Sequence, residues 1–244
     1  MKTKHAFSAT TMMVLMVVFT QFISSCTVAN TFGIKGSGTK ASEKREIGSF
    51  RGLDVSGGFE VVLTQGTVES LVIEADDNLM RHIITEVRGG ELNIYTRDNV
   101  SARTPMVAYL TFVNLEDIDI SGAVSVNAKD KLTFNRLSID GSGASELEFE
   151  ADIRNLTAGF SGASTVKLRG NAQNMEIECS GASKLYLADM QVSTAKLELS
   201  GASYGEVWVI ERLDVESSGA SDVRYKGNPQ LTMDTSGASS VKKL

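Results

Sequence analysis

The chain has 244 residues and a formal net charge of −6, from 24 Lys and Arg against 30 Asp and Glu. A negatively charged surface disfavours nucleic acid and anionic lipid as partners, because both would be repelled. The whole sequence holds two histidines and two cysteines. That is too few for a metal site built from these residue types.

The first 25 residues predict a secretory signal peptide. Lys2 and Lys4 precede an apolar segment, residues 12–19, that is too short to span a bilayer. An aliphatic residue and two serines then precede Cys26, which resembles the bacterial lipobox. That resemblance implies that Cys26 is lipidated and becomes the mature N-terminus. A signal peptide cut near Ser25, or an uncleaved anchor, is the alternative.

Lipidation would anchor the protein in the cell envelope, at the outer membrane, on either its periplasmic or its surface side. Removing residues 1–25 takes away two lysines and no carboxylate. The mature charge would then be 22 − 30 = −8.

Residues 26–46 combine glycine with mixed charge and show no apolar period, so we expect a flexible tether. Residues 47–115 predict a smaller β-rich segment, because apolar residues alternate through most of it. One short capped helix is expected over residues 79–87. Two glycines also predict a hairpin between residues 85–87 and residues 92–95.

The second half of the chain repeats the phrase Ser-Gly-Ala-Ser. A variant begins at Ser121, and full copies begin at Ser142, Ser161, Ser180, Ser200, Ser218 and Ser236. The copies are 21, 19, 19, 20, 18 and 18 residues apart, a period typical of stacked repeats. Apolar and polar residues alternate on both sides of each phrase, which predicts two strands per repeat.

We therefore predict an all-β protein in which residues 116–244 form a parallel β-solenoid of about seven coils. Glycine is expected at each tight corner, where a positive φ would strain other residues. Leucine-rich repeats have a similar length, but they need a leucine–asparagine ladder that this sequence lacks.

Three aromatic residues form a candidate ligand face on the outgoing side of the repeats. Trp208 is the only tryptophan and falls at an outward position, while Gly205 takes an inward place in the same repeat. Tyr186 and Tyr204 lie at outward positions of neighbouring coils. An ordinary exposed aromatic residue is the alternative interpretation of Trp208. Cys179 falls at an inward position and predicts a small core residue without a disulfide partner.

Acidic residues recur two positions before the first serine of six copies: Asp119, Asp140, Glu178, Glu198, Glu216 and Asp234. Stacking would align them about 4.8 Å apart on an outward strand face. The last four, Glu178, Glu198, Glu216 and Asp234, are a candidate cation column that calcium could neutralise. The alternative is a solvated acidic face that discourages pairing with other chains.

Stacked serines raise the question of Ser–His–Asp catalysis. Beyond the signal peptide, His82 is the only histidine, and it lies outside the repeats. No nucleophile motif surrounds any of the serines. We therefore expect no catalytic residues and no cofactor apart from the candidate calcium. The serines should instead bond backbone groups at tight corners.

These features together resemble the head GIN domain family, whose members are labelled auto-transporter adhesins. The likeness covers about residues 48–240 and rests on the repeated phrase and three earlier stretches, namely Phe50-Arg51-Gly52-Leu53-Asp54-Val55-Ser56-Gly57, Gln65-Gly66 and Gly90-Glu91-Leu92-Asn93-Ile94. The resemblance implies a β-helical, exported domain, commonly behind a lipoprotein signal. It brings no catalytic residues.

The sequence favours a non-enzymatic exported lipoprotein whose flat solenoid faces bind carbohydrate, protein or envelope material. One alternative is a polysaccharide-active β-helix enzyme of the lyase kind, which needs calcium-binding acids beside a base such as Lys196 in a cleft. A structural envelope protein is the other. The expected partners are the membrane, through the lipid, and an unidentified glycan or protein, with no nucleic acid. The sequence leaves the oligomeric state open.

Overall fold

The computed structural model of the chain describes residues 33–244. The predicted signal peptide, Cys26 and residues 26–32 of the predicted tether lie outside the described residues. Within residues 33–244, no helix is long and apolar enough to cross a membrane.

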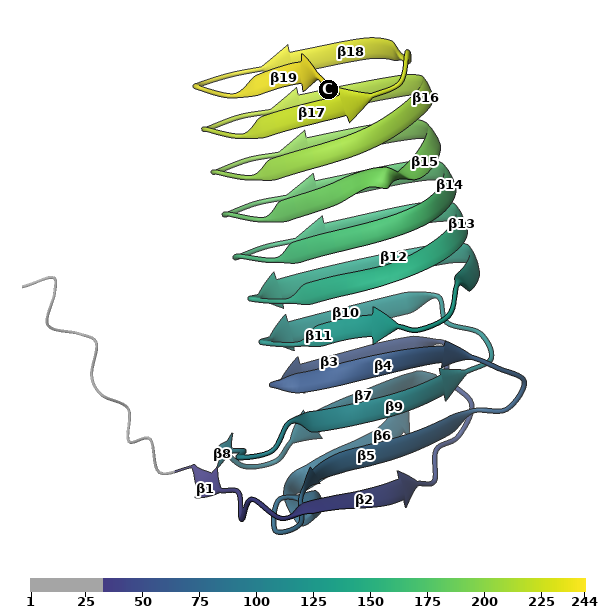
Figure 1. The fold of residues 1–244 in the computed structure, drawn as a ribbon, viewed down its shortest axis with the longest axis vertical. Coiled ribbons are helices and arrows are strands. Elements are labelled where there is room, and N and C mark those ends of the chain that lie inside the picture. Colours follow the sequence, from purple (N-terminus) through teal and green to yellow (C-terminus); the bar gives the residue numbers. More distant parts are fainter. Residues whose placement is uncertain (1–32) are drawn as a thin grey trace, which may run out of the picture. The chain divides into compact units, whose positions relative to one another are not determined.

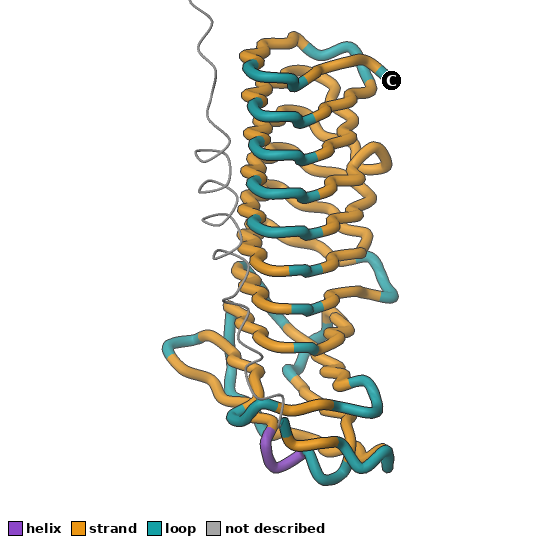
Figure 2. Tube along the Cα trace, turned by 90° about the vertical axis from the view of Figure 1, so that its left-hand side faces the viewer, coloured by secondary structure: helices purple, strands orange, loops and turns teal. Residues whose placement is uncertain are grey.

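Residues 34–244 form one unit built around a parallel β-solenoid, and about seven of its coils lie within residues 116–244, which confirms the predicted fold (Figure 1). Each coil has an ingoing strand that leads into the Ser-Gly-Ala corner and an outgoing strand that leaves it. Like strands of successive coils pair in parallel, so two columns of strands run along the solenoid. Figure 2 shows the corners stacked above one another as a row of loops.

The ingoing column stacks in the order β7 (Glu91–Thr96), β3 (Gly52–Gly57), β10 (Asp117–Gly122), β12 (Leu132–Gly143), the second halves of β13 (Glu146–Phe160), β14 (Thr165–Cys179), β15 (Lys184–Leu199) and β16 (Tyr204–Ser217), and β18 (Gln230–Thr235). The outgoing column stacks in the order β9 (Met106–Phe112), β4 (Phe59–Gln65), β11 (Ser125–Ala128), the first halves of β13 to β16, β17 (Asp222–Lys226) and β19 (Ser240–Lys243). Because strands β13 to β16 each continue around the second corner, one strand serves both columns.

The solenoid begins earlier than the sequence predicted. Strand β3 pairs with β10 residue by residue, from Gly52 beside Asp117 to Gly57 beside Gly122. The two columns therefore run through the expected boundary between residues 115 and 116. The phrase Ser56-Gly57 occupies the place that Ser-Gly occupies in every later coil.

The repeated phrase makes the corner because its glycine has a backbone that other residues rarely adopt. Gly162 has a φ of +90°, and the Ala163 N–H donates to the carbonyl oxygen of Gly143 in the previous coil at 2.8 Å. The serine at the fourth position of the phrase lies on the inner side of the corner. Ser145 is buried, and its hydroxyl donates to the carbonyl of Ser142 at 3.0 Å. Ser203, Ser221 and Ser239 make the same expected bond to backbone, whereas the equivalent hydroxyls of Ser164 and Ser183 are buried without a hydrogen-bond partner.

The core fills the space between the two columns. The residues three positions before each first serine are buried from Ile118 to Val215, as predicted, and Cys179 is a buried free cysteine. Each fully buried aliphatic side chain contributes about 2 kcal/mol to folding. Met233, at the same position of the last coil, is 58% exposed because no further coil of the described chain covers it.

Antiparallel strands close the N-terminal end of the solenoid. Strand β5 (Ser70–Asp76) pairs with β9 on one side and with β2 (Lys40–Arg45) on the other. Strand β1 (Ile34–Lys35) pairs in parallel with β8 (Val100–Ser101). Strands β5 and β2 thus extend the sheet beyond the first coil, whereas β1 and β8 form a separate two-stranded sheet.

The expected flexible tether therefore does not describe residues 34–35 and 40–45, which lie in strands. Strand β2 is an edge strand held by main-chain bonds, so it needs no apolar period. The buried carboxylate of Asp76 helps to fix this region. It accepts the backbone N–H groups of Gly38 at 2.7 Å, Arg103 at 2.8 Å and Thr104 at 3.2 Å.

The predicted helix over residues 79–87 is also wrong beyond its first turn. Only Met80–His82 is helical, as one 3₁₀ turn, and β6 (Ile83–Arg88) follows at once. Strand β6 forms an antiparallel hairpin with β7, which confirms the predicted hairpin. The β-branched residues of β6 suit a strand, and Gly89 and Gly90 supply the positive φ of its turn.

Candidate functional site

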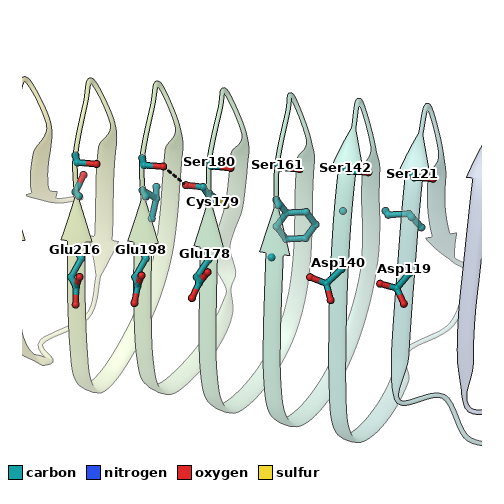
Figure 3. A pocket seen from close by; sticks show the side chains of 18 of the residues that line it. Asp119, Ser121, Asp140, Ser142, Ser161, Glu178, Cys179, Ser180, Glu198 and Glu216 are labelled. Atoms are coloured by element: carbon teal, nitrogen blue, oxygen red, sulfur yellow. Dashed lines mark hydrogen bonds between the residues drawn. The ribbon is translucent and has the colours of Figure 1, made fainter.

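A groove of about 870 Å³ follows the ingoing strands just before the corners (Figure 3). We call it the acid–serine groove, and it is lined by one acid column and one serine column, namely Asp54, Asp119, Asp140, Glu178, Glu198, Glu216 and Asp234 with Ser121, Ser142, Ser161, Ser180, Ser200, Ser218 and Ser236. In Figure 3 the labelled acids lie in a row, one step along the strands from the labelled serines.

The register places the predicted acids beside one another. Glu178 pairs with Glu198, Glu198 with Glu216, and Glu216 with Asp234. The column also includes Asp54, which the sequence reasoning missed. The signal was present, because Asp54 stands two residues before Ser56-Gly57 as the other acids stand before their serines.

Burial and neighbouring acids both act on Asp119, at the N-terminal end of the groove. The pKa of Asp119 is raised, first by partial burial and then by the nearby carboxylates of Asp140, Glu91, Asp54 and Asp117. Farther along, Lys196 contacts Glu198 and lies 3.6 Å from Glu176. The charge of the column is thus partly compensated in one coil.

The acid column does not gather its oxygens around one point. Among residues 33–244, no group of three or more His, Cys, Asp or Glu side chains is arranged to hold a metal ion. Gly159 also interrupts the row between Asp140 and Glu178. Calcium bridging between coils stays a prediction.

The three predicted aromatic residues lie on the outer face of the outgoing column. The rings of Tyr186 and Tyr204 contact each other, with centroids 6.0 Å apart. Trp208 lies farther along the same strand as Tyr204, with Glu206 between them at an outward position. We call Tyr186, Tyr204, Glu206 and Trp208 the aromatic face.

Basic side chains cover parts of these rings. The Arg224 guanidinium lies 5.4 Å from the centre of the Tyr204 ring, and the Lys226 ammonium lies 4.0 Å from the centre of the Trp208 ring. Both cations follow from the register, because β17 places Arg224 beside Glu206 and Lys226 beside Trp208. Sequence reasoning missed them, although they occupy the same repeat positions as Glu206 and Trp208.

A carboxylate lies at the centre of the aromatic face. The Tyr204 hydroxyl donates to Glu206, and this hydrogen bond, with burial as a second cause, raises the pKa of Tyr204 to about 12. Glu206 retains further acceptor capacity, because a carboxylate offers about four lone-pair sites. The site thus combines apolar ring planes, a carboxylate that can accept hydrogen bonds from hydroxyl groups, and cations.

The one pronounced irregularity of the outgoing column borders Trp208. Between β15 and β16 the register passes from Leu187 beside Val207 to Gln191 beside Trp208. The bulge formed by residues 188–190 lies next to the indole. Bulges commonly re-aim side chains beside binding sites, and here the bulge places Gln191 of β15 beside Trp208.

His82 lies away from the serine ladder, in the N-terminal segment. Its Nδ1 atom is 2.7 Å from Asp98, and Arg81 donates to its Nε2 atom at 3.1 Å. These two contacts occupy both ring nitrogens.

The family of the chain follows from its sequence as well as its fold. Residues 49–229 match the family described as "Putative auto-transporter adhesin, head GIN domain", so the chain belongs to this family. The predicted resemblance is confirmed. Membership in an adhesin family indicates an extracellular or envelope protein. The adhesin label of the family indicates a binding function. No curated protein matches the sequence.

Solved structures from Bacteroides and Parabacteroides species share the fold. A "putative adhesin" from Bacteroides fragilis NCTC 9343 is 21% identical with a TM-score of 0.82, over 87% of this chain and 100% of that one. A "putative lipid binding protein" from Parabacteroides distasonis ATCC 8503 is 21% identical with a TM-score of 0.70, over 86% and 99%. A "putative adhesin" from Parabacteroides merdae ATCC 43184 is 17% identical with a TM-score of 0.69, over 87% and 99%.

Proposed function

We propose that the chain is a non-enzymatic, exported adhesin that binds carbohydrate on its aromatic face. In this proposal Cys26 carries the lipid that anchors the protein in the cell envelope, at the outer membrane. The solenoid then acts as a rigid support that presents the outgoing strands to a ligand. The contact between Tyr186 and Tyr204, with Trp208 farther along the same strand face, is the observation that carries the proposal.

Aromatic side chains suit a sugar ligand because each has an apolar face and a polar edge. Tyr186 is 38% exposed, so its ring plane is available to the C–H groups of a sugar. The Glu206 carboxylate can accept sugar hydroxyls, which fixes the orientation of the ligand. The rings sit on a strand face, so little conformational entropy is lost when a ligand binds.

The alternative of a lyase-like enzyme has less support. Such an enzyme needs calcium-binding acids and a base in one cleft, whereas Lys196 is engaged by Glu198 and Glu176. The acid–serine groove and the aromatic face also lie on different strand columns. Incubation with pectin and related polymers would expose a lyase, since β-elimination yields an ultraviolet-absorbing product.

A glycan array, followed by calorimetry of each hit, tests the proposal. Tyr186→Ala should weaken binding roughly tenfold, because aromatic anchors commonly account for 1–3 kcal/mol each. Tyr109→Ala is the matched control. Tyr109 is also 38% exposed and outward on β9 of the same column, but it lies at the N-terminal end. Equal affinity of Tyr186→Ala and Tyr109→Ala for every hit would contradict the proposal.

A further inference from the structure

The C-terminal end of the outgoing face has a charge opposite to that of the whole molecule. Four exposed cations surround the aromatic face, namely Lys184, Arg224, Lys226 and Lys242, and we call them the basic rim. The register sets each in place. Lys184 lies beside Tyr204, Arg224 beside Glu206, Lys226 beside Trp208, and Lys242 beside Arg224.

Few acids accompany the rim. On the outgoing strands of the coils that carry the rim, the acidic side chains are Asp189, Glu206 and Asp222, so four rim cations against three anions leave 4 − 3 = +1. The whole chain has a net charge of −6. Arg224 donates to Asp222 at 3.2 Å, whereas Lys184, Lys226 and Lys242 form no ion pair with any described residue.

We propose that the aromatic face and the basic rim bind an acidic polysaccharide, a sugar polymer that carries carboxylate or sulfate groups. This inference rests on the proposed carbohydrate-binding function and names the class of sugar. In this inference the acidic groups of the polysaccharide pair with Lys226, Lys242 and Lys184. The hydroxyl groups of its sugar rings donate to Glu206. The Tyr186 and Tyr204 rings contact the sugar faces.

The spacing of the site suits a polymer rather than a single sugar. Tyr186, Glu206, Arg224 and Lys242 share one outward row across four successive coils. With coils about 4.8 Å apart, the row spans about 14 Å. A short stretch of an extended polysaccharide, lying along the solenoid axis, reaches every member of the row.

The chemistry favours an acidic sugar over a nucleic acid. Glu206 and Asp222 lie among the cations and would repel a chain of phosphates, to which DNA adds no backbone hydroxyl donor and RNA adds only one per phosphate. A sugar acid supplies hydroxyl donors together with its anionic group. The carboxylates therefore become acceptors for the ligand instead of obstacles to it.

Calorimetry with a matched pair of ligands tests the inference. A short oligogalacturonate and its fully methyl-esterified form share one backbone and differ in charge. The purified protein, in a chelator that removes calcium, should bind the acidic form roughly five- to tenfold more tightly, because charge-assisted hydrogen bonds are lost on esterification. Binding of the acidic form should weaken as salt is raised.

Variants locate the effect. Lys226→Gln and Lys242→Gln should each weaken binding of the acidic form several-fold and leave the ester unaffected. Lys129→Gln is the control, because Lys129 is exposed and forms no ion pair among the described residues but lies outside the rim. It should bind like the unaltered protein.

Equal affinity for acid and ester, both lost in Tyr186→Ala, overturns the acidic-sugar inference and leaves the carbohydrate-binding function standing. Binding of neither form, with no hit on a glycan array, overturns both. Tighter binding of single-stranded DNA or of vesicles with anionic lipid, lost in Lys226→Gln, would show that the rim serves another class of ligand and would overturn the inference.

Discussion

Substitution of a corner glycine should destabilise the solenoid more than substitution at its other positions. Gly162 is a suitable glycine for this test. Gly162 has a φ of +90°, and a Cβ atom there would lie 2.4 Å from the carbonyl oxygen of Gly143. That oxygen cannot move freely, because it accepts the Ala163 N–H at 2.8 Å. Gly162→Ala therefore combines backbone strain with a clash against a fixed backbone atom.

The two effects can be given magnitudes. A non-glycine residue in a left-handed conformation costs about 1–2 kcal/mol. Overpacking against structure that cannot yield costs about 1–3 kcal/mol more, so Gly162→Ala should lose about 2–5 kcal/mol. Over a chain of this size the melting temperature should fall by roughly 5–15 °C.

Gly89→Ala separates strain from clash. Gly89 has a φ of +62°, but no atom lies within 4 Å of the position of its Cβ. Gly89→Ala should lose only the backbone strain, about 1–2 kcal/mol. Urea unfolding of both variants, followed by circular dichroism, measures the difference. Equal losses, or a larger loss for Gly89→Ala, would refute the stacking argument for the corners.

Other changes test separate parts of the structure. Burial raises the pKa of Asp76, but the backbone N–H groups of Arg103, Thr104 and Gly38 lower it more, so the net pKa lies below its usual value of 3.8. The stability that Asp76 contributes is present above pH 3.8 and is lost as pH falls through the folded-state pKa; Asp76→Asn should lower the melting temperature at pH 7, and an unchanged value would contradict this role. The pKa shift of Asp119 has the opposite sign, because burial and neighbouring acids raise its pKa above 3.8. Its charge therefore destabilises the fold at neutral pH, so Asp119→Asn should raise the melting temperature at pH 7 and have little effect below pH 3.8; a lower melting temperature at pH 7 would disagree. Burial raises the pKa of the Cys179 thiol to about 12, so in a Cys26→Ala variant a thiol reagent should label the protein only in denaturant. Rapid labelling of the native variant would show that Cys179 is accessible. If calcium bridges the acid column, millimolar calcium should raise the melting temperature of the unaltered protein and not of Glu198→Gln, whereas no shift in either would remove calcium from the account.

The fold was predictable where a local pattern repeats. Glycine at a fixed place, and alternation on either side of it, specify a corner and two strands in each coil. Strand β2 was not predicted because its own residues show no pattern typical of a strand. Its hydrogen-bond partners are residues far along the chain. Lys40 lies opposite Asp76 in the antiparallel ladder, and the Asp76 carboxylate accepts the backbone N–H of Arg103.

Competing local signals explain the wrong helix. The acid and amide residues before Leu79 are typical of a helix cap, but the β-branched Ile83, Ile84 and Val87 favour a strand. The hairpin with β7 decides the outcome, because it pairs β6 residue by residue.

The candidate site was predictable only in part for a related reason. Tyr186 and Tyr204 could be placed on neighbouring coils because both precede the bulge, but they occupy different repeat positions, with Tyr186 beside Glu206 and Tyr204 beside Lys184, so their rings meet diagonally. The position of Trp208 depends on the bulge in β15, which places it beside Gln191. Counting from the repeated phrase would place it beside Ala188. The location of a bulge is decided by packing, which a single sequence does not display.

Trp208 offers the most direct test of the central claim, which is that ligand binds on the aromatic face. The chain has one tryptophan, and the indole lies in this face under Lys226. Titration with an oligogalacturonate should change its fluorescence in a saturable way, with the same affinity that calorimetry gives. The change should weaken in Lys226→Gln and persist in Lys129→Gln. A calorimetric binding signal that leaves the Trp208 emission unchanged would place the ligand elsewhere and contradict the account.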